Sequence, residues 1–466
     1  MATMACSIRL TVAEGVKHPV LSLKTEVNQA WVQHQTSQQP LIHCQGNLPE
    51  GLCLTVFEGK GGTTLLLESE VGHTQDLLVF ALPGSKLAFK NGCQIEFFTH
   101  ATLSGKPDVA PPVASQPARQ NPAGQNPAGV QAHTPQAMIL GAGIGTRILP
   151  LTDTLVGLAK PALPLDGQHT VIGRIAQHLN EHGFQQLFVN TFYQRPSVWQ
   201  ALQQAIEGTD AQLNEIPEHR ATGTAGGLVE ILKHPEKYPT FNRALPILIM
   251  QGDAVTDADL SALVQTHVEK GAVLTIGCQI VSDADVDKFG IIATQAAHSQ
   301  DPSGPITRFL EKPSLSEAGP HRLGSTGFYV LSPAIYPLLE SVYETKLRQD
   351  VEHAKQTGQA EPKEAEEIDF AKDLFPEVLR QCEQGTLNGP MWAQVVPGYW
   401  CDIGNPAQYL ETLQALYTHQ LPLPELDINA NAYDQGVVFW PDAKPLAEHV
   451  GLTATGNVIV GRKFKA

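Results

Sequence analysis

The sequence Leu140-Gly-Ala-Gly-Ile-Gly-Thr-Arg147 decides how this chain of 466 residues is interpreted, because a short apolar run leads directly into a glycine-rich turn. The run, residues 137–140, is typical of a buried β-strand. Glycines in the turn lack Cβ atoms, so its backbone can adopt positive φ and approach a ligand closely. Backbone N–H groups in such a turn bind phosphate oxygens, and Arg147 and Lys160 add positive charge. The stretch therefore predicts a polyphosphate site after a strand.

The spacing of this glycine loop excludes the two best-known phosphate-binding motifs. The Gly-x-x-x-x-Gly-Lys-Ser/Thr pattern is absent, and Thr146 stands where a dinucleotide fingerprint needs its third glycine. A glycine turn in some other α/β protein remains the alternative from the loop alone. The residues that we expect to bind nucleotide in the loop are Leu140, Gly141, Ala142, Gly143, Gly145, Thr146 and Arg147.

Composition restricts the partners that the chain can have. A net charge of −16 argues against a general surface for nucleic acid or anionic membranes, so an anionic substrate needs a local basic pocket. Seven cysteines without C-x-x-C pairs fit a reducing compartment. Neither a signal peptide nor an apolar membrane segment is recognised, so we expect a cytoplasmic protein without a membrane partner. The oligomeric state is not defined, and a homo-oligomer is left open.

Four regions are expected along the chain. Residues 1–105 contain short β-rich runs separated by turns, which predict a small β domain whose role the sequence does not indicate. Residues 106–135 are rich in Pro, Ala and Gln and predict a flexible linker. Residues 136–422 form the main domain, and residues 423–466 contain short Val/Ile-rich runs that predict a small β stub.

The main domain alternates short apolar strands with helical segments. This order predicts an α/β fold, a Rossmann-like, mostly parallel mixed sheet with helices on both faces. The strands are expected at residues 137–140, 186–189, 245–250, 272–280 and 328–331, and the helices at 171–182, 197–207, 226–232, 260–270 and 370–381. The charge-rich run 346–367 interrupts the alternation and is expected to be an exposed helix or loop insertion. Ligands in such sheets bind beyond the carboxyl ends of the strands, where the glycine loop also lies.

Two aspartates stand in contexts that suit a magnesium site. Asp253 directly follows the apolar strand 245–250, and Asp402 lies in the glycine-flanked stretch Gly398-Tyr-Trp-Cys-Asp-Ile-Gly404. Taken alone, each aspartate is as readily explained as a turn residue or a helix cap. As a pair, they could hold one Mg²⁺ bound to nucleotide phosphates between distant strands.

Read together, these motifs resemble the sugar-phosphate nucleotidylyltransferases, the pyrophosphorylases that make nucleoside-diphosphate sugars. The glycine loop with Arg147 and Lys160-Pro161 resembles the family's Gly-x-Gly-Thr-Arg…Pro-Lys signature, although Ala159 replaces the usual proline and the spacer near residues 155–158 is about three residues longer. The order of the other motifs also fits: the turn 222–227, Gly252-Asp253, Phe289-Gly290-Ile-Ile292, Phe309-Leu-Glu-Lys-Pro313, Ser325-Thr326-Gly327, and the stretch around Asp402.

The resemblance implies a role for each motif. Gly145, Thr146 and Arg147 would bind the β- and γ-phosphates and Lys160 the α-phosphate, while Asp253 and Asp402 would hold Mg²⁺. Gly223 and Thr224 would lie in a turn packed on the nucleobase. Glu311 would accept hydrogen bonds from sugar hydroxyls, Lys312 would contact the sugar phosphate, and Gly290 and Thr326 would line the sugar pocket. The tail would form a short β-helix-like stub, as at the C-terminus of many relatives.

The implied reaction joins an NTP and a sugar 1-phosphate to give an NDP-sugar and pyrophosphate. Positioning and charge neutralisation should dominate its catalysis, so Arg147, Lys160, Asp253 and Asp402 are the expected catalytic residues and no general base is required. Glucose 1-phosphate with UTP is the favoured pair, followed by mannose 1-phosphate with GTP. The alternative is a catalytically silent protein that binds sugar nucleotide and regulates a partner; the longer spacer and the extra N-terminal domain give it some support.

Overall fold

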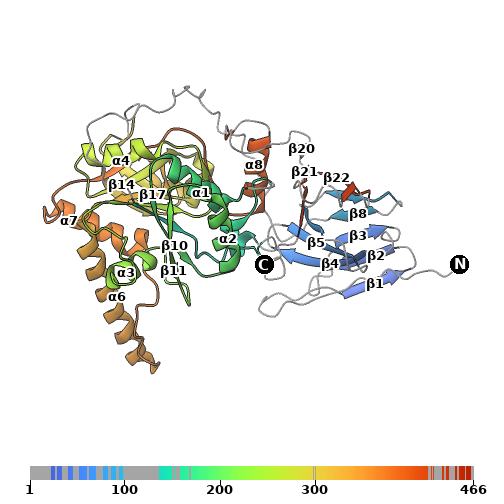
Figure 1. Ribbon diagram of the computed structural model, residues 1–466, viewed down its shortest axis with the longest axis horizontal. Coiled ribbons are helices and arrows are strands. Elements are labelled where there is room, and N and C mark those ends of the chain that lie inside the picture. The colour runs from blue at the N-terminus through green and yellow to red at the C-terminus, as the bar shows by residue number, and fades with distance from the viewer. Residues whose placement is uncertain are drawn as a thin grey trace. The chain divides into compact units, whose positions relative to one another are not determined.

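A computed structural model describes two compact units of the chain, drawn in Figure 1. The first, called here the α/β unit, comprises residues 115–143 and 171–402; the second, called the β unit, comprises residues 1–114, 144–170 and 403–466. The residues described are 22–26, 29–33, 40–45, 52–59, 62–69, 77–81, 85–90, 94–97, 136–148, 152, 158–166, 169–296, 299, 301–417, 421, 423, 433–434, 437–439, 447–448, 451–456 and 458–462. The linker expected at 106–135 and most of the long spacer before Lys160 lie outside them.

The α/β unit alternates strands and helices as the sequence predicts. Its strands are β9 (Gln136–Leu140), β10 (Gln186–Thr191), β11 (Gln212–Pro217), β12 (Ile247–Gln251), β13 (Ala254–Thr256), β14 (Leu274–Ile280), β15 (Gly290–Thr294), β16 (Gly304–Glu311), β17 (Leu323–Leu331), β18 (Met391–Val395) and β19 (Trp400–Asp402). Its α-helices are α1 (Val171–Glu181), α2 (Arg195–Ala205), α3 (Gly226–Lys233), α4 (Leu260–Glu269), α5 (Leu315–Ala318), α6 (Ile335–Thr357) and α7 (Phe375–Glu383). A π-helical turn, η4 (Phe370–Leu374), precedes α7.

Nine of these strands form one mixed sheet in the order β11-β10-β9-β12-β17-β14-β18-β16-β15. The four strands β11, β10, β9 and β12 are parallel to one another, whereas β17 and the pairings of β15 and β16 are antiparallel. The prediction of a mixed sheet is therefore confirmed. β14 and β18 form a further parallel pair, and only β17 and β16 run antiparallel to both of their neighbours in the sheet order. Because β9 and β12 are adjacent and parallel, the glycine loop after β9 and Asp253 after β12 leave the sheet at the same edge.

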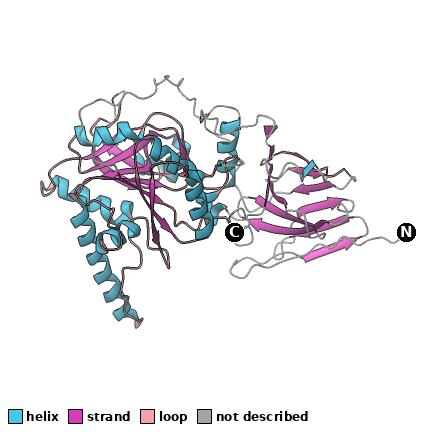
Figure 2. Cartoon of the chain, viewed as in Figure 1, coloured by secondary structure: helices cyan, strands magenta, loops and turns pink. Residues whose placement is uncertain are grey.

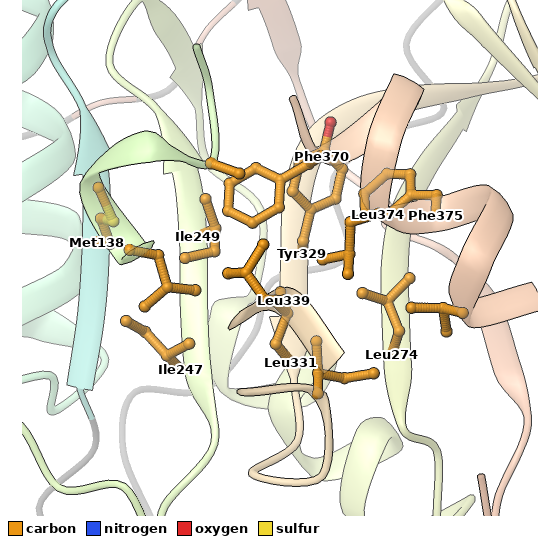
Figure 3. Close-up of a cluster of buried hydrophobic side chains, with 14 of the residues drawn as sticks. Met138, Ile247, Ile249, Leu274, Tyr329, Leu331, Leu339, Phe370, Leu374 and Phe375 are labelled. Atoms are coloured by element: carbon orange, nitrogen blue, oxygen red, sulfur yellow. The ribbon is translucent and has the colours of Figure 1, made fainter. Parts of the chain in front are cut away.

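Helices cover both faces of the sheet. Helices α3, α6 and α7 pack on one face through a cluster of buried apolar side chains, several of which are labelled in Figure 3. Helix α4 packs on the opposite face: its His267 contacts Thr275, whereas Leu274 and Ile276 of the same strand belong to the cluster. Figures 1 and 2 show the two groups of helices on either side of the strands. Successive side chains of β14 point to opposite faces of the sheet, so this strand contributes to the packing on both faces.

Most predicted elements of this unit are confirmed to within a few residues. The five predicted strands correspond to β9, β10, β12, β14 and β17, and four of the predicted helices to α1, α2, α3 and α4. The helix expected at 370–381 is split into η4 and α7, because Pro376 lacks a backbone N–H and suits the start of a new helix. The charge-rich run 346–367 is partly helical: α6 extends to Thr357 and a loop follows.

The C-terminal tail corrects one expectation. Residues 453–462 are not β-helix-like: β22 (Thr453–Thr455) pairs with β7 (Lys86–Ala88), and β23 (Val458–Arg462) pairs with β6 (Leu77–Ala81), both antiparallel. The buried side chains Val458, Ile459 and Val460 explain this pairing, since burial against an existing sheet needs no repeated coils. The tail and the N-terminal region therefore share one β unit.

The β unit holds two six-stranded sheets, ordered β1-β2-β3-β8-β7-β22 and β20-β21-β23-β6-β5-β4. The β-rich character predicted for the N-terminal region is confirmed. The remaining strands are β1 (Ser22–Glu26), β2 (Gln29–Gln33), β3 (Pro40–Gln45), β4 (Leu52–Gly59), β5 (Gly62–Ser69), β8 (Gln94–Phe97), β20 (Tyr433–Asp434) and β21 (Val437–Phe439). This unit also contains helix α8 (Pro406–Tyr417). Among the described residues of the whole chain, no helix combines the length and apolarity needed to span a membrane.

His267 on α4 predicts a pH-dependent contribution to stability. Its Nε2 lies 2.9 Å from the Ser332 hydroxyl, which itself donates to the carbonyl of Ala272, and its Nδ1 lies 2.9 Å from the Thr275 hydroxyl. This arrangement suits a neutral ring that donates from Nε2 and accepts at Nδ1. Burial lowers the pKa of His267 from 6.5 to about 4.

Acidification should therefore destabilise the α/β unit. Between pH 6.5 and 4 the unfolded chain binds a proton at His267 and the folded chain does not, so the free energy of unfolding should fall by up to about 1.4 kcal/mol per pH unit. Denaturant unfolding of wild type and His267→Gln at several pH values checks this. The variant should show a shallower slope by about one proton; identical slopes would contradict the assignment.

Candidate active site

The glycine loop leaves the sheet directly after β9, as predicted. The backbone N–H of Gly141 donates to Oδ1 of Asn190 at 2.9 Å, and a Cβ at position 141 would lie 2.9 Å from the carbonyl oxygen of Asn190. A Cβ at Gly143, by contrast, would meet no heavy atom of the described residues within 4 Å, and Gly143 is exposed. The base of the loop is thus fixed by neighbouring backbone, while Gly143 faces open space that a ligand can enter.

The second half of the loop lies against the expected phosphate-binding lysine, within the β unit. Gly145 has φ +65°, and a Cβ there would lie 2.8 Å from Cβ of Lys160. Lys160 opens a short 3₁₀ turn and is only 7% exposed, whereas Thr146 and Arg147 are exposed. The structure therefore brings Gly145 and Lys160 together although the chain between them is long. Glycine is needed at 145 for both its backbone angle and this close approach.

The two aspartates come from adjacent strands of the α/β unit. Strands β13 and β19 form a two-stranded ladder in which Ala254 is the partner of Asp402, so Asp253 lies one residue beyond that pair. The N–H of Gly252 donates to the carbonyl of Leu140 at 3.0 Å, which holds Asp253 beside the start of the glycine loop. Both aspartates are half-buried. The backbone therefore places the two aspartates near each other, and their predicted sharing of one metal ion stays a prediction.

This pair of carboxylates fits Mg²⁺. The ion prefers oxygen ligands and is commonly held by one or two carboxylates, with substrate phosphates and water completing an octahedron. Within the described part of the chain, no group of three or more His, Cys, Asp or Glu side chains gathers in a metal-binding arrangement. Two aspartates at the carboxyl edge of the sheet are the donor set expected for a nucleotide-linked ion.

The residues expected to bind the sugar phosphate also lie together. Gly290 pairs with Glu311 across β15 and β16, and a Cβ at 290 would lie 3.3 Å from Oε2 of Glu311. Both Glu311 and Lys312 are exposed, with Nζ of Lys312 3.8 Å from Oε1 of Glu311. Lys312 has φ +45°, which is uncommon for a residue with a side chain. Such strain is found at ligand-binding positions, in keeping with the predicted role.

Thr326 is buried and its hydroxyl is engaged within the sheet, donating to the carbonyl of Gly277 at 2.8 Å. Its own carbonyl accepts a 3.1 Å hydrogen bond from the indole of Trp400 on β19. These bonds tie the segment predicted to line the sugar pocket to the strand that carries Asp402. Any contact of Thr326 with a sugar would therefore come from its backbone.

The turn expected to pack on the nucleobase is held by a distant segment. Gly223 has φ +82°, and a Cβ there would overlap the carbonyl oxygen of Ile368. The Thr224 hydroxyl lies 2.8 Å from Asp369 and accepts from the N–H of Phe370 at 3.0 Å. Glycine at 223 is thus explained by the approach of the 368–370 backbone and needs no nucleobase. The predicted contact of this turn with nucleotide remains a prediction.

Sequence reasoning missed Asn190, which joins the glycine loop to the region before this turn. Asn190 is 3% exposed; its Oδ1 accepts from Gly141 and its Nδ2 donates to Oε1 of Glu218 at 2.8 Å. Burial raises the pKa of the Glu218 carboxyl, partly offset by its hydrogen bond from Asn190. Asn190 could have been found from the sequence as a polar residue at the carboxyl end of a predicted parallel strand, where ligands bind.

Asn190→Ala should impair the site more than the fold. It leaves the Gly141 N–H without its acceptor, which costs about 1–3 kcal/mol. If the loop shifts in response, kcat/KM for the nucleotide should fall by about 10-fold or more. Asn190→Asp keeps the acceptor for Gly141 and loses the donor to Glu218, which separates the two bonds. Steady-state kinetics with varied NTP checks this; wild-type kcat/KM in Asn190→Ala would contradict it.

A glycine-rich loop and an aspartate that follow adjacent parallel strands are typical of nucleotide-binding α/β proteins. The profile of one family, described as nucleotidyl transferase, matches residues 136–419, more than half of the chain. The chain belongs to this nucleotidyl transferase family.

Curated relatives resemble the same region. A UTP–glucose-1-phosphate uridylyltransferase of Synechocystis sp. is 28% identical over 313 residues, covering 64% of this chain and 68% of the relative. A glucose-1-phosphate adenylyltransferase of Hydrogenovibrio crunogenus is 26% identical over 362 residues, covering 71% of this chain and 76% of the relative. A crystal structure of apo UDP-glucose pyrophosphorylase aligns with 62% of this chain and all of its own, at 18% identity and a TM-score of 0.46.

Proposed function

We propose that the chain is a Mg²⁺-dependent sugar-1-phosphate nucleotidylyltransferase that makes an NDP-sugar and pyrophosphate from an NTP and glucose 1-phosphate. The observation that carries the proposal is the pairing of β13 with β19, in which Asp402 lies opposite Ala254, the residue that follows Asp253; the N–H of Gly252 bonds the Leu140 carbonyl at the start of the glycine loop. Family membership and the names of the two relatives support the reaction class and the sugar.

In this proposal each group neutralises or orients charge. The backbone of the glycine loop with Thr146 and Arg147 binds the β- and γ-phosphates, and Lys160 binds the α-phosphate. A phosphate oxygen of the sugar 1-phosphate attacks the α-phosphorus in line, and pyrophosphate leaves. Asp253 and Asp402 would hold Mg²⁺, which screens repulsion between the phosphates when bound. Glu311 and Lys312 orient the sugar and its phosphate.

UTP is the proposed nucleotide, with ATP the first competitor because the two relatives differ in this substrate. The test is pyrophosphate release with Mg²⁺, using UTP, ATP, GTP, CTP and dTTP, each paired with glucose 1-phosphate or mannose 1-phosphate. The highest kcat/KM is expected for UTP with glucose 1-phosphate. A preference for mannose 1-phosphate would overturn the sugar assignment. No release from any pair, with retained binding of UDP-glucose, would favour a silent regulatory protein.

A further inference from the structure

The ladder that brings the two aspartates together is short. It consists of three residue pairs: Ala254 with Asp402, Val255 with Cys401, and Thr256 with Trp400. If β19 shifted by one residue along β13, each of its side chains would point to the opposite face of the ladder. The side chain of Asp402 would then change face as well. Three pairs specify the register of two strands weakly, so contacts outside the ladder contribute to it. One is the hydrogen bond from the Trp400 indole to the Thr326 carbonyl, and a second involves Asp257.

The contact of Asp257 lies at the end of the ladder remote from the aspartates. The N–H of Tyr399 donates to Oδ1 of Asp257 at 2.5 Å. The Tyr399 carbonyl accepts from the Thr256 hydroxyl at 2.7 Å and from the Asp257 N–H at 3.3 Å. Both backbone groups of Tyr399 are thus bound by the last residue of β13, Thr256, and the residue that follows it, Asp257. A hydrogen bond from a backbone N–H to a carboxylate is stronger than one to a neutral acceptor.

Glycine at position 398 makes this contact possible. Gly398 has φ +111°, and a Cβ there would lie 2.3 Å from Oδ1 of Asp257. The Gly398 carbonyl accepts from Nε2 of Gln279 on β14 at 2.9 Å, which anchors the segment to the main sheet. The carboxylate of Asp257 therefore occupies the volume that any other residue at 398 would fill. The turn Gly398-Tyr399 is shaped around that carboxylate.

We propose that Asp257 is a positioning residue that helps to fix the register of β19 on β13 and so holds Asp402 opposite Ala254, the residue that follows Asp253. The inference rests on the proposed function for its metal, but the register that it explains is a property of the chain itself. Asp257 acts through the backbone of Tyr399 and does not itself need to reach the ion. Its removal should loosen the metal pair while leaving the glycine loop intact.

Mn²⁺ binding provides a test that does not depend on turnover. Free Mn²⁺ is measured by electron paramagnetic resonance during titration of the full chain, without nucleotide or sugar. Asp257→Ala should weaken Mn²⁺ binding by about 10-fold or more, the loss expected for a hydrogen bond to a charged group. Asp257→Asn keeps an oxygen acceptor for Tyr399 and should restore most of the affinity. Asp210→Ala, an exposed carboxylate elsewhere in the unit, is the matched control.

Gly398→Ala gives a second approach if Asp257→Ala folds poorly. Its methyl group should displace the carboxylate and weaken Mn²⁺ binding in the wild-type background. In the Asp257→Ala variant there is no carboxylate for the methyl group to displace. The losses of Mn²⁺ affinity from the two substitutions should therefore be less than additive. Unchanged Mn²⁺ affinity in both single variants, with only a lower melting temperature, would overturn the positioning role.

Kinetics separate this inference from the proposed function. If wild type forms NDP-sugar, Asp257→Ala should raise the Mg²⁺ concentration needed for half-maximal rate, with little change in KM for the sugar phosphate. An unaltered Mg²⁺ requirement would overturn the inference while leaving the proposed function intact. If wild type forms no NDP-sugar but Mn²⁺ binding still depends on Asp257, the proposed function fails and the positioning role stands.

Discussion

Asp402→Asn and Asp253→Asn should each abolish turnover, to below about 10⁻³ of the wild-type kcat, while the protein remains folded. Asparagine keeps the size of the side chain and an oxygen, but removes the negative charge that an Mg²⁺ ligand set of two carboxylates provides. Both residues are only half-buried; Asp402 lies at the end of a short ladder and Asp253 one residue beyond it, so the cores should be unaffected. The measurement is kcat against Mg²⁺ concentration, with circular dichroism as the check of folding.

Asp210→Asn is the control for these two variants, because it removes an equal charge from an exposed loop and should behave as wild type. Near-normal Mg²⁺-dependent activity in either Asp253→Asn or Asp402→Asn would refute the metal assignment. Partial rescue at high Mg²⁺ in one variant only would mean that the two aspartates contribute unequally, and the pair would still hold.

Lys160→Ala should reduce kcat by about 10²–10³-fold, the effect typical of a preorganised group that stabilises charge developing in the transition state. Lys160 is 7% exposed and its stem lies against Gly145, so the stem of the side chain is packed before substrate binds. Lys160→Arg keeps the charge but changes the geometry, and it should recover only part of the rate.

One control variant and two kinetic outcomes test the contact of Lys160 with the α-phosphate. Lys363→Ala removes an exposed lysine and should leave kcat unchanged, which controls for loss of charge alone. A Lys160→Ala effect confined to KM for the sugar 1-phosphate would contradict contact with the α-phosphate. A large rise in KM for the NTP at constant kcat would mean that Lys160 binds ground and transition states equally.

Local patterns predicted much of the α/β unit correctly. Strands such as β9 and β12 are continuous apolar runs, and the residues at their ends, Gly141 and Asp253, follow directly in sequence. Their positions need only the rule that ligands bind beyond the carboxyl ends of strands. The same reasoning anticipated that Asp253 and Asp402 could act as a pair, although 149 positions separate them.

Contacts between distant segments were beyond such reasoning. Asn190 meets Gly141 from 49 residues away and Asp257 meets Tyr399 from 142 residues away, and neither spacing leaves a local pattern. The approach of the Ile368 backbone to Gly223, from 145 positions along the chain, likewise has no local pattern in the sequence. The tail strand β23 was expected in a short β-helix-like stub, and its actual partner, β6, could not be foreseen because it lies more than 370 residues earlier in the chain.

Product analysis by ³¹P nuclear magnetic resonance tests the central claim most directly. The wild-type chain is incubated with UTP, glucose 1-phosphate and Mg²⁺, and each phosphorus species is followed with time. Nucleotidyl transfer predicts equal amounts of UDP-glucose and pyrophosphate, with neither UMP nor orthophosphate. Pyrophosphate with UMP in place of UDP-glucose would mean hydrolysis of the nucleotide, and no products with this pair or with the other NTPs and sugar 1-phosphates would contradict the account.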